Sequence, residues 1–143
     1  MRRQIGAGVC LLGLSFGAVV QAAGDQCKSL TYESHNQIDY GPIIVNSIRG
    51  VAQDAQGVPI PKACVGVFTE TEHKLLAVAE TDDGGRFELT VIPRGEYRLV
   101  AKYEGFCPVN AKLRIGRRSK DKKPLMLQMR PAGLDSCSYV EAK

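Results

Sequence analysis

The stretch that decides the fold reads TDDGGRFELTVIPRGEYRLVA and covers residues 81–101. Apolar and polar side chains alternate over residues 86–91 and again over residues 97–102, and this period of two is typical of a β-strand with one buried face. Turn-forming residues precede each run, at residues 82–85 and 93–95. We therefore expect two strands here, with Asp82-Asp83-Gly84-Gly85 as a hairpin turn before the first of them.

Short apolar runs of the same kind extend in both directions from this stretch. Residues 54–57 are a turn signal, and residues 58–61 are expected to be extended because each proline restricts the residue before it. No window has the spacing of an amphipathic helix. Seven short strands with frequent turns predict an all-β protein, an antiparallel β-sandwich. The five further strands are expected at residues 43–53, 63–68, 75–81, 109–115 and 124–130.

Length and composition limit the chain to one domain of modest size. It has 143 residues, of which 44% are hydrophobic and 24% are charged. This excludes a disordered chain and leaves no room for two full domains. The formal net charge of +4 is too small to indicate nucleic-acid binding by itself.

Residues 1–22 have the layout of a secretory signal peptide. Arg2 and Arg3 form a basic start, no charged residue follows until Asp25, and Val20-Gln21-Ala22 supplies the short side chains that signal peptidase reads. We expect cleavage after Ala22, which exports the protein to the periplasm or the extracellular medium and leaves no transmembrane span. The alternative is an uncleaved membrane anchor.

Four cysteines remain once Cys10 leaves with the signal peptide, namely Cys27, Cys64, Cys107 and Cys137. An even number in an exported chain predicts two disulfides, for which three pairings exist. Cys27 and Cys137 flank the domain, whereas Cys64 and Cys107 lie inside it. The pairing that we favour is therefore Cys27–Cys137 with Cys64–Cys107.

A set of motif residues recurs in order between Ile48 and Phe106. It reads Ile48-x-Gly50-x-Ala52-x-Asp54, Gly57-x-Pro59-Ile60-Pro61-x-Ala63-x-Val65, Thr81-Asp82-Asp83-Gly84-Gly85-Arg86-Phe87-x-Leu89, Pro93-x-Gly95-x-Tyr97-x-Leu99 and Gly105-Phe106. Together these residues resemble a carboxypeptidase regulatory-like domain. The resemblance covers about half of the exported chain, and it concerns the fold more than the chemistry.

The resemblance implies a transthyretin-like, seven-stranded, antiparallel Greek-key β-sandwich, which we place at residues 43–130. Residues 23–42 are then an extended N-terminal arm, and residues 131–143 a C-terminal tail tied by a disulfide. The implied order of strands makes the strands next to Cys64 and Cys107 antiparallel neighbours, in agreement with the favoured pairing. Tyr97 is expected to bury its ring and to satisfy its hydroxyl group at an edge of the sandwich.

Candidate catalytic and metal-ligating residues are few. Asp82 and Asp83, with Glu80 near, could bind calcium, but a solvated turn is the simpler interpretation. His35 lies in the polar arm and His73 at a predicted turn, so both are expected to be exposed. No Cys-x-x-Cys pair occurs, and we expect neither a metal nor a cofactor.

Two enzyme families share the implied sandwich, and this chain lacks the catalytic and metal-binding motifs that define them. The transthyretin-related hydroxyisourate hydrolases use a histidine on the first strand and a C-terminal Tyr-Arg-Gly-Ser. In this chain, residues 48–50 of the first strand contain no histidine, and residues 137–141 near the end do not contain that tetrapeptide. Intradiol dioxygenases need two tyrosines and two histidines around iron. We expect no enzymatic activity, and the alternative is a small hydrolase with an unrecognised site.

Basic residues concentrate in one segment that we expect to form a hairpin end. Asp121 is the only acid within it, so the segment is a candidate contact for an anionic partner. An envelope protein or an anionic envelope component is the partner we expect, and nucleic acid is not, because no aromatic residues are interleaved for base stacking. A soluble loop that protects sheet edges is the alternative. The basic residues are Lys112, Arg114, Arg117, Arg118, Lys120, Lys122 and Lys123.

The sequence therefore predicts an exported, non-catalytic β-sandwich module stapled by two disulfides, with a binding or structural role in the cell envelope. Its oligomeric state, its ligand and its partner are not encoded in any pattern described above. A sheet-edge interaction protein is a third interpretation, which an exposed and uncharged edge strand would favour.

Overall fold

The structure is a computed structural model, and it describes residues 24–32, 38–89, 92–116, 124–133 and 137. The signal peptide expected at residues 1–22 lies outside this part of the chain. One short 3₁₀ helix, η1 (Cys27–Ser29), precedes the strands in the described residues. The eight strands of the described residues are β1 (Ile38–Val45), β2 (Ile48–Gln53), β3 (Cys64–Thr69), β4 (Leu75–Glu80), β5 (Arg86–Leu89), β6 (Gly95–Lys102), β7 (Val109–Ile115) and β8 (Leu125–Gln128).

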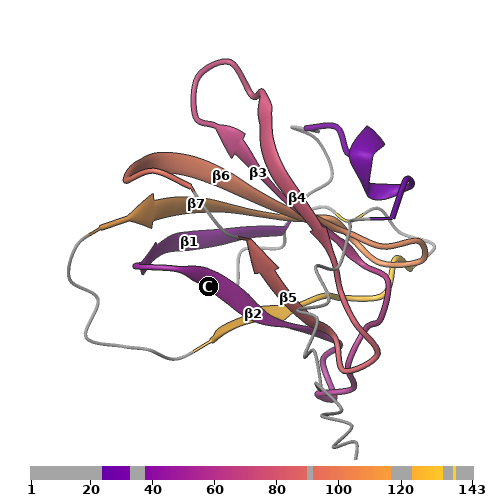
Figure 1. The fold of residues 1–143 in the computed structure, drawn as a ribbon. Coiled ribbons are helices and arrows are strands. Elements are labelled where there is room, and N and C mark those ends of the chain that lie inside the picture. Colours follow the sequence, from indigo (N-terminus) through magenta and orange to yellow (C-terminus); the bar gives the residue numbers. More distant parts are fainter. Residues whose placement is uncertain (1–23, 33–37, 90–91, 117–123, 134–136, 138–143) are drawn as a thin grey trace, which may run out of the picture.

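The strands form two sheets that pack face to face, as the sequence predicted for an all-β sandwich (Figure 1). The larger sheet has the order β1-β7-β6-β3-β4, and the smaller sheet has the order β5-β2-β8. We expected a purely antiparallel sandwich, but the pairs β1/β7 and β2/β8 are parallel. The remaining neighbours, such as β3/β4 and β6/β7, are antiparallel.

The strand count differs from the seven expected because the first predicted strand is in fact two. Residues 43–53 do not form one strand, since β1 ends at Val45 in the larger sheet and β2 begins at Ile48 in the smaller sheet. Strand β1 also begins at Ile38, inside the segment predicted to be an extended arm. The chain changes sheets at Asn46 and Ser47, and periodicity alone does not reveal such a change because both halves alternate.

The turn at Asp82–Gly85 is a connection between the two sheets, not the hairpin turn predicted. Strand β4 before it lies in the larger sheet and β5 after it lies in the smaller one. Asp82 Oδ1 accepts the backbone N–H groups of Gly84 at 2.9 Å and of Arg86 at 2.8 Å. Gly85 has φ +71° and sits against Ala52, so a side chain at this position would be both strained and crowded.

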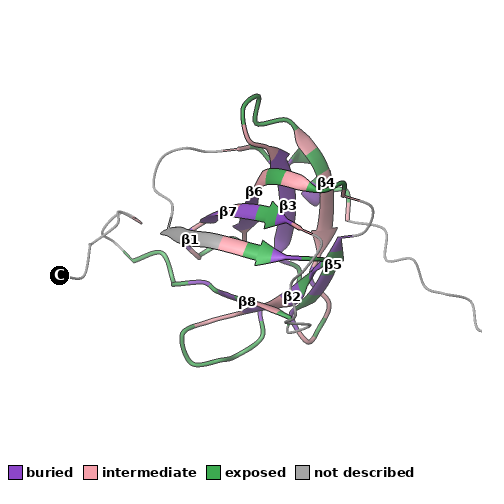
Figure 2. Cartoon of the chain, turned by 90° about the vertical axis from the view of Figure 1, so that its left-hand side faces the viewer, coloured by how far each residue is buried: buried purple, intermediate pink, exposed green. Residues whose placement is uncertain are grey.

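The main core lies between the two sheets and follows the alternation that predicted the strands. In β5, Phe87 and Leu89 are buried while Arg86 and Glu88 are exposed. Figure 2 shows how the buried residues gather along β3, in the middle of the larger sheet. The fully buried side chains from the two sheets include Ile48, Leu127, Val65, Val67, Leu99 and Leu113.

A second, smaller core covers the opposite face of the larger sheet. Here the arm residues Cys27 and Leu30 pack on Cys64, Phe68 and Val100. Figure 1 shows η1 beside β3 and β4, where this contact is made. The central strands of the larger sheet are therefore covered on both faces, which explains why β3 is buried at five of its six positions.

The two disulfides join Cys27 to Cys64 and Cys107 to Cys137, so the pairing that we favoured is wrong. Cys64 is the first residue of β3 and faces the arm, not the interior between the sheets. Its partner on β6 is Lys102, after which the chain turns away through residues 103–106. Cys107 thus comes to lie beside the end of β8, where its N–H group donates to the Arg130 carbonyl at 2.8 Å.

Candidate functional site

Two of the seven basic residues predicted as a contact surface lie in the described residues, both on β7. Arg114 Nη2 is 2.6 Å from Glu96 Oε1, and Lys112 Nζ is 3.7 Å from Glu96 Oε2. The hydrogen bond from Arg114, together with the charges of Lys112 and Arg114, lowers the pKa of the exposed Glu96 carboxyl below its ordinary value. These two cations therefore have an anionic neighbour within the sheet.

The other five basic residues, Arg117, Arg118, Lys120, Lys122 and Lys123, lie outside the described residues. The segment is not the end of a hairpin, because β7 before it and β8 after it belong to different sheets. It connects the two layers of the sandwich.

His73 and Tyr32 form a stacked pair at the edge of the second core. Their rings are 3.8 Å apart and inclined by 10°. Tyr32 also packs edge-on against Phe68, and its hydroxyl oxygen accepts a hydrogen bond from Asn110 Nδ2 at 3.1 Å. His73 is exposed, as predicted, and the contacts tie the arm to the sheet. His35 lies outside the described residues.

The acidic residues considered for calcium do not converge. Asp82 caps its own turn and lies 3.7 Å from Arg86 Nε, whereas Glu80 points toward the arm at Gly24 and Cys27. Within the described residues, no three His, Cys, Asp or Glu side chains gather as metal ligands. Asp82 is thus a turn residue. Tyr97, on β6, has a structural contact of its own, since its hydroxyl donates to the Pro93 carbonyl at 2.7 Å, at an edge of the sandwich as predicted.

The edge strand β4 is uncharged from Leu75 to Ala79 and exposes 44% of Leu76. Its pairing with β3 is irregular at this point, because the register shifts between Val67 and Phe68. A bulge of this kind twists an edge away from regular pairing with another strand. Strand β4 therefore combines one feature that favours strand addition with one that opposes it.

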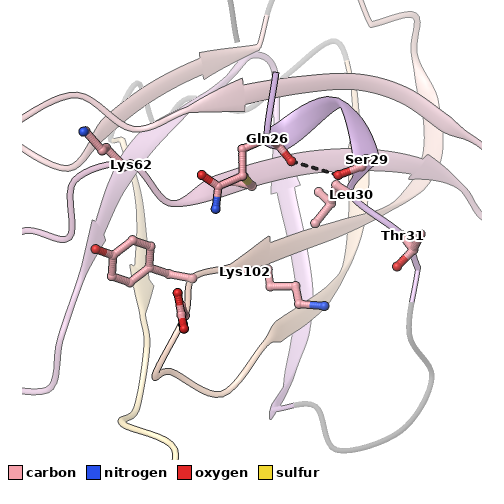
Figure 3. A pocket seen from close by; sticks show the side chains of 9 residues that line it. Gln26, Ser29, Leu30, Thr31, Lys62 and Lys102 are labelled. Carbon is pink, nitrogen blue, oxygen red and sulfur yellow. Dashed lines mark hydrogen bonds between the residues drawn. The ribbon is translucent and has the colours of Figure 1, made fainter. Parts of the chain in front are cut away.

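A groove between the arm and the larger sheet is a site that the sequence did not indicate (Figure 3). Its volume is about 300 Å³. Two lysines, three hydrogen-bonding arm residues and one aromatic residue line it. The groove exists because the arm folds back onto the larger sheet, where Cys27 is bonded to Cys64. The sequence did not indicate the groove because this disulfide was not the one predicted. The lining residues are Gln26, Ser29, Leu30, Thr31, Lys62, Cys64, Lys102, Tyr103 and Glu104.

A second hollow of about 330 Å³ lies on the smaller sheet. Arg49 and Arg86 border it, and Val51 and Pro124 are among its apolar residues.

Within the described residues, no helix is long and apolar enough to cross a membrane.

Comparison with known proteins identifies the family. The fold is a disulfide-stapled β-sandwich, and the family model of the carboxypeptidase regulatory-like domain matches residues 47–124, more than half of the chain. The chain therefore belongs to the carboxypeptidase regulatory-like domain family, as its motif residues suggested. No curated protein matches it.

Two solved structures are similar to parts of this chain. The 5-hydroxyisourate hydrolase of Klebsiella pneumoniae is 21% identical, with a TM-score of 0.47, over 64% of this chain and 96% of that protein. The 3-chlorocatechol 1,2-dioxygenase of Rhodococcus opacus 1CP is 14% identical, with a TM-score of 0.42, over 63% of this chain and 59% of that protein.

Family and covalent structure together define a class of protein. Carboxypeptidase regulatory-like domains are generally non-catalytic. Two disulfides indicate an oxidising compartment outside the cytoplasm. The chain is thus a disulfide-bonded β-sandwich domain of an extracytoplasmic kind.

Proposed function

We propose that this protein is an exported, non-catalytic carboxypeptidase regulatory-like module with a binding or structural role in the cell envelope, in the periplasm or outside the cell. The observation that carries the proposal is the pair of disulfides, which ties the arm to β3 and the tail to the connection between β6 and β7. Bonds of this kind stabilise small exported domains by restricting the unfolded chain.

The segment Lys112–Lys123 is the contact surface that we propose for an anionic envelope component. Glu96 offsets part of the charge of Lys112 and Arg114. Residues 117–123 add five cations and one acid, so the surplus charge of the segment comes from this part. A concentration of like charge attracts an anionic surface and is screened by salt.

The intact mass of the exported protein tests the cleavage of the signal peptide and the formation of the disulfides together. We expect the mass of residues 23–143 less four hydrogens, and a gain on reduction and alkylation that corresponds to four thiols. A peptide map without reductant should link Cys27 to Cys64 and Cys107 to Cys137. A full-length mass with free thiols would overturn export, and with it the envelope role.

Binding to vesicles that contain phosphatidylglycerol tests the contact surface. We expect binding at about 0.1 M salt, where the screening length is about 10 Å, and loss of binding at about 1 M, where it is about 3 Å. The triple substitution Arg117→Gln, Arg118→Gln, Lys120→Gln should abolish binding. A control that removes the same charge at exposed Lys74, Arg94 and Arg130 should retain most of it. Equal loss in both variants, or binding that ignores salt, contradicts the proposed surface.

A further inference from the structure

Glu80, the last residue of β4, carries a carboxylate that lies against the start of the described arm. A Cβ added at Gly24 would overlap Glu80 Oε2 and would lie 3.2 Å from Glu80 Cδ. Figure 1 shows the arm beside β4, where this contact is made. The carboxylate therefore occupies the space that a side chain at position 24 would take, and it reaches the main chain of the arm.

This carboxylate has no proton donor among the described residues. Its polar contact there is with Cys27 Sγ, at 3.8 Å from Glu80 Oε2, and this sulfur has no proton to donate because it is bonded to Cys64. None of the ion pairs in the described part of the chain includes Glu80. A half-buried carboxylate without a donor is unfavourable, which points to a donor that these residues do not contain.

The residue before Gly24 supplies such a donor once the chain is processed. Ala23 lies outside the described residues, but consecutive Cα atoms are about 3.8 Å apart, so its bond to Gly24 keeps the Ala23 nitrogen within reach of the carboxylate. In the precursor this nitrogen belongs to the uncharged peptide bond that follows Ala22. Cleavage after Ala22 converts it into an ammonium group, with a positive charge and three N–H donors.

We propose that Glu80 binds the α-ammonium group that cleavage of the signal peptide creates on Ala23. The pair joins the new N-terminus to β4, beside the disulfide that holds the same arm to β3. This proposal rests on the proposed cleavage after Ala22. It makes Glu80 a positioning residue whose partner exists only in the processed chain.

Two of the cations near the arm have other partners. Lys28 Nζ is 2.6 Å from Asp25 Oδ1. Lys102 lies two strands away from Glu80, because Cys64 stands between them in the row across the sheet, and Lys102 interacts with another group. Neither lysine therefore takes the place of the N-terminus at Glu80.

Lys62 is the cation that the experiment has to exclude. Its N–H donates to the carbonyl of Thr81, the residue after Glu80, at 2.9 Å. This hydrogen bond contributes to its φ of +59°, in the left-handed region. Its side chain forms no ion pair with Glu80 within the described residues. A Lys62→Gln variant therefore tests whether Lys62 competes with Ala23.

An NMR titration of the oxidised chain of residues 23–143 tests the pair, with the α-amino group of Ala23 as the reporter. We expect its pKa to lie at least about 0.5 above the ordinary value of about 8, because a nearby carboxylate favours the charged form. Glu80→Gln should return the pKa to the ordinary value. Glu72→Gln, which removes the same charge beyond the opposite end of β4, should leave it raised, and so should Lys62→Gln.

Three results of the titration overturn the pair. The first is an ordinary pKa of the Ala23 amino group in the natural sequence. The second is an equal effect of Glu80→Gln and Glu72→Gln, which would show only the general charge of the protein. The third is a pKa that is raised only after Lys62→Gln, which would make Lys62 the partner of Glu80.

A comparison with a longer chain separates the ammonium group from the packing of Glu80 itself. A chain of residues 20–143 keeps Val20–Ala22 and moves the ammonium group three residues away. At about pH 6, Glu80→Gln should lower the thermal midpoint of residues 23–143 by about 2–4 °C and leave that of residues 20–143 unchanged. Since pairing raises the pKa of the amino group, this difference is present below about pH 8 and is lost as the pH rises through the raised value. An equal loss in both chains overturns the assignment.

The proposed cleavage and the proposed pair fail in different ways. An intact mass that shows another N-terminus overturns the cleavage after Ala22 and, with it, the role of the pair in the exported protein. An ordinary pKa in a chain that does begin at Ala23 overturns the pair alone.

Discussion

The hydroxyl oxygen of Thr81, a residue of the sequence motif, holds a distant turn in place. The sequence predicted this motif residue as the last residue of a strand. Its hydroxyl bridges the Ile60 carbonyl and the Ala63 N–H inside the protein, where Thr81 is only 3% exposed. Two backbone groups depend on it, and a buried backbone group without a partner is costly. One side chain thus controls a turn that lies about twenty residues away in the chain.

Replacement of Thr81 by Val should lower the free energy of unfolding by about 2–4 kcal/mol, because valine keeps the shape and removes both hydrogen bonds. Thr81→Ser keeps the hydroxyl and should cost less. Urea unfolding followed by circular dichroism measures both. Equal stability of the valine and serine variants would show that the bridge does not stabilise the turn.

Gly50 is a second position where one atom matters. A Cβ there would overlap the Leu125 carbonyl oxygen and lie 2.8 Å from Phe87 Cζ, between the two layers of the sandwich. Gly50→Ala should therefore destabilise the protein by about 1–3 kcal/mol, as overpacking does. Gly116→Ala, where no atom lies within 4 Å, is the control and should change stability by less than about 1 kcal/mol. A shift in the urea midpoint distinguishes the two.

At the scale of the strands, alternation predicted which residues face the core and failed to predict which sheet each strand joins. Phe87, Leu89 and Leu99 are buried as their spacing indicated. The split between Val45 and Ile48 was missed, because a strand that ends in one sheet and one that begins in the other have the same pattern. A turn such as Asp82–Gly85 shows that the chain reverses locally, but not which layer it enters.

The candidate site was less accessible to sequence analysis than the fold. The groove depends on Cys27 meeting Cys64, and four cysteines allow three pairings that spacing does not separate. Lys62 carried no signal either, since its unusual φ arises from hydrogen bonds to Thr81, a residue distant in the chain. The basic segment was visible in the sequence, whereas its neighbour Glu96 becomes part of the site through the pairing of β6 with β7.

Glu96 on β6, with its partners on β7, makes the stability of the protein depend on pH. Because its pKa is lowered from 4.5 in the folded protein, its contribution to stability is present above the ordinary pKa and is lost as the pH falls through the lowered one. Glu96→Gln should thus destabilise the protein at about pH 7, where Glu96 is ionised, and this effect should disappear at a pH below the lowered pKa. Urea unfolding at both values, with Glu72→Gln as the control, measures the difference. An effect of equal size at both values contradicts the assignment.

At the scale of the whole molecule, each disulfide anchors one flanking segment to the sandwich. Their sequence separations are similar, 37 and 30 residues, so the loss of either should cost about 2–4 kcal/mol through the unfolded chain. Cys27→Ser/Cys64→Ser should cost more than Cys107→Ser/Cys137→Ser, because it also releases the small core of Leu30, Phe68 and Val100. Thermal unfolding of the two variants tests this order, and the reverse order would contradict it.

The observed pairing also decides how the chain behaves when it is cut. The two covalent loops, residues 27–64 and 107–137, follow one another along the chain and are not nested. A single cleavage between Cys64 and Cys107, for instance after exposed Arg94, thus produces two fragments that no covalent bond joins. In native buffer they remain one particle, because β3 from the first fragment pairs with β6 from the second. In denaturant without any reductant they separate, whereas nested disulfides would have kept them together.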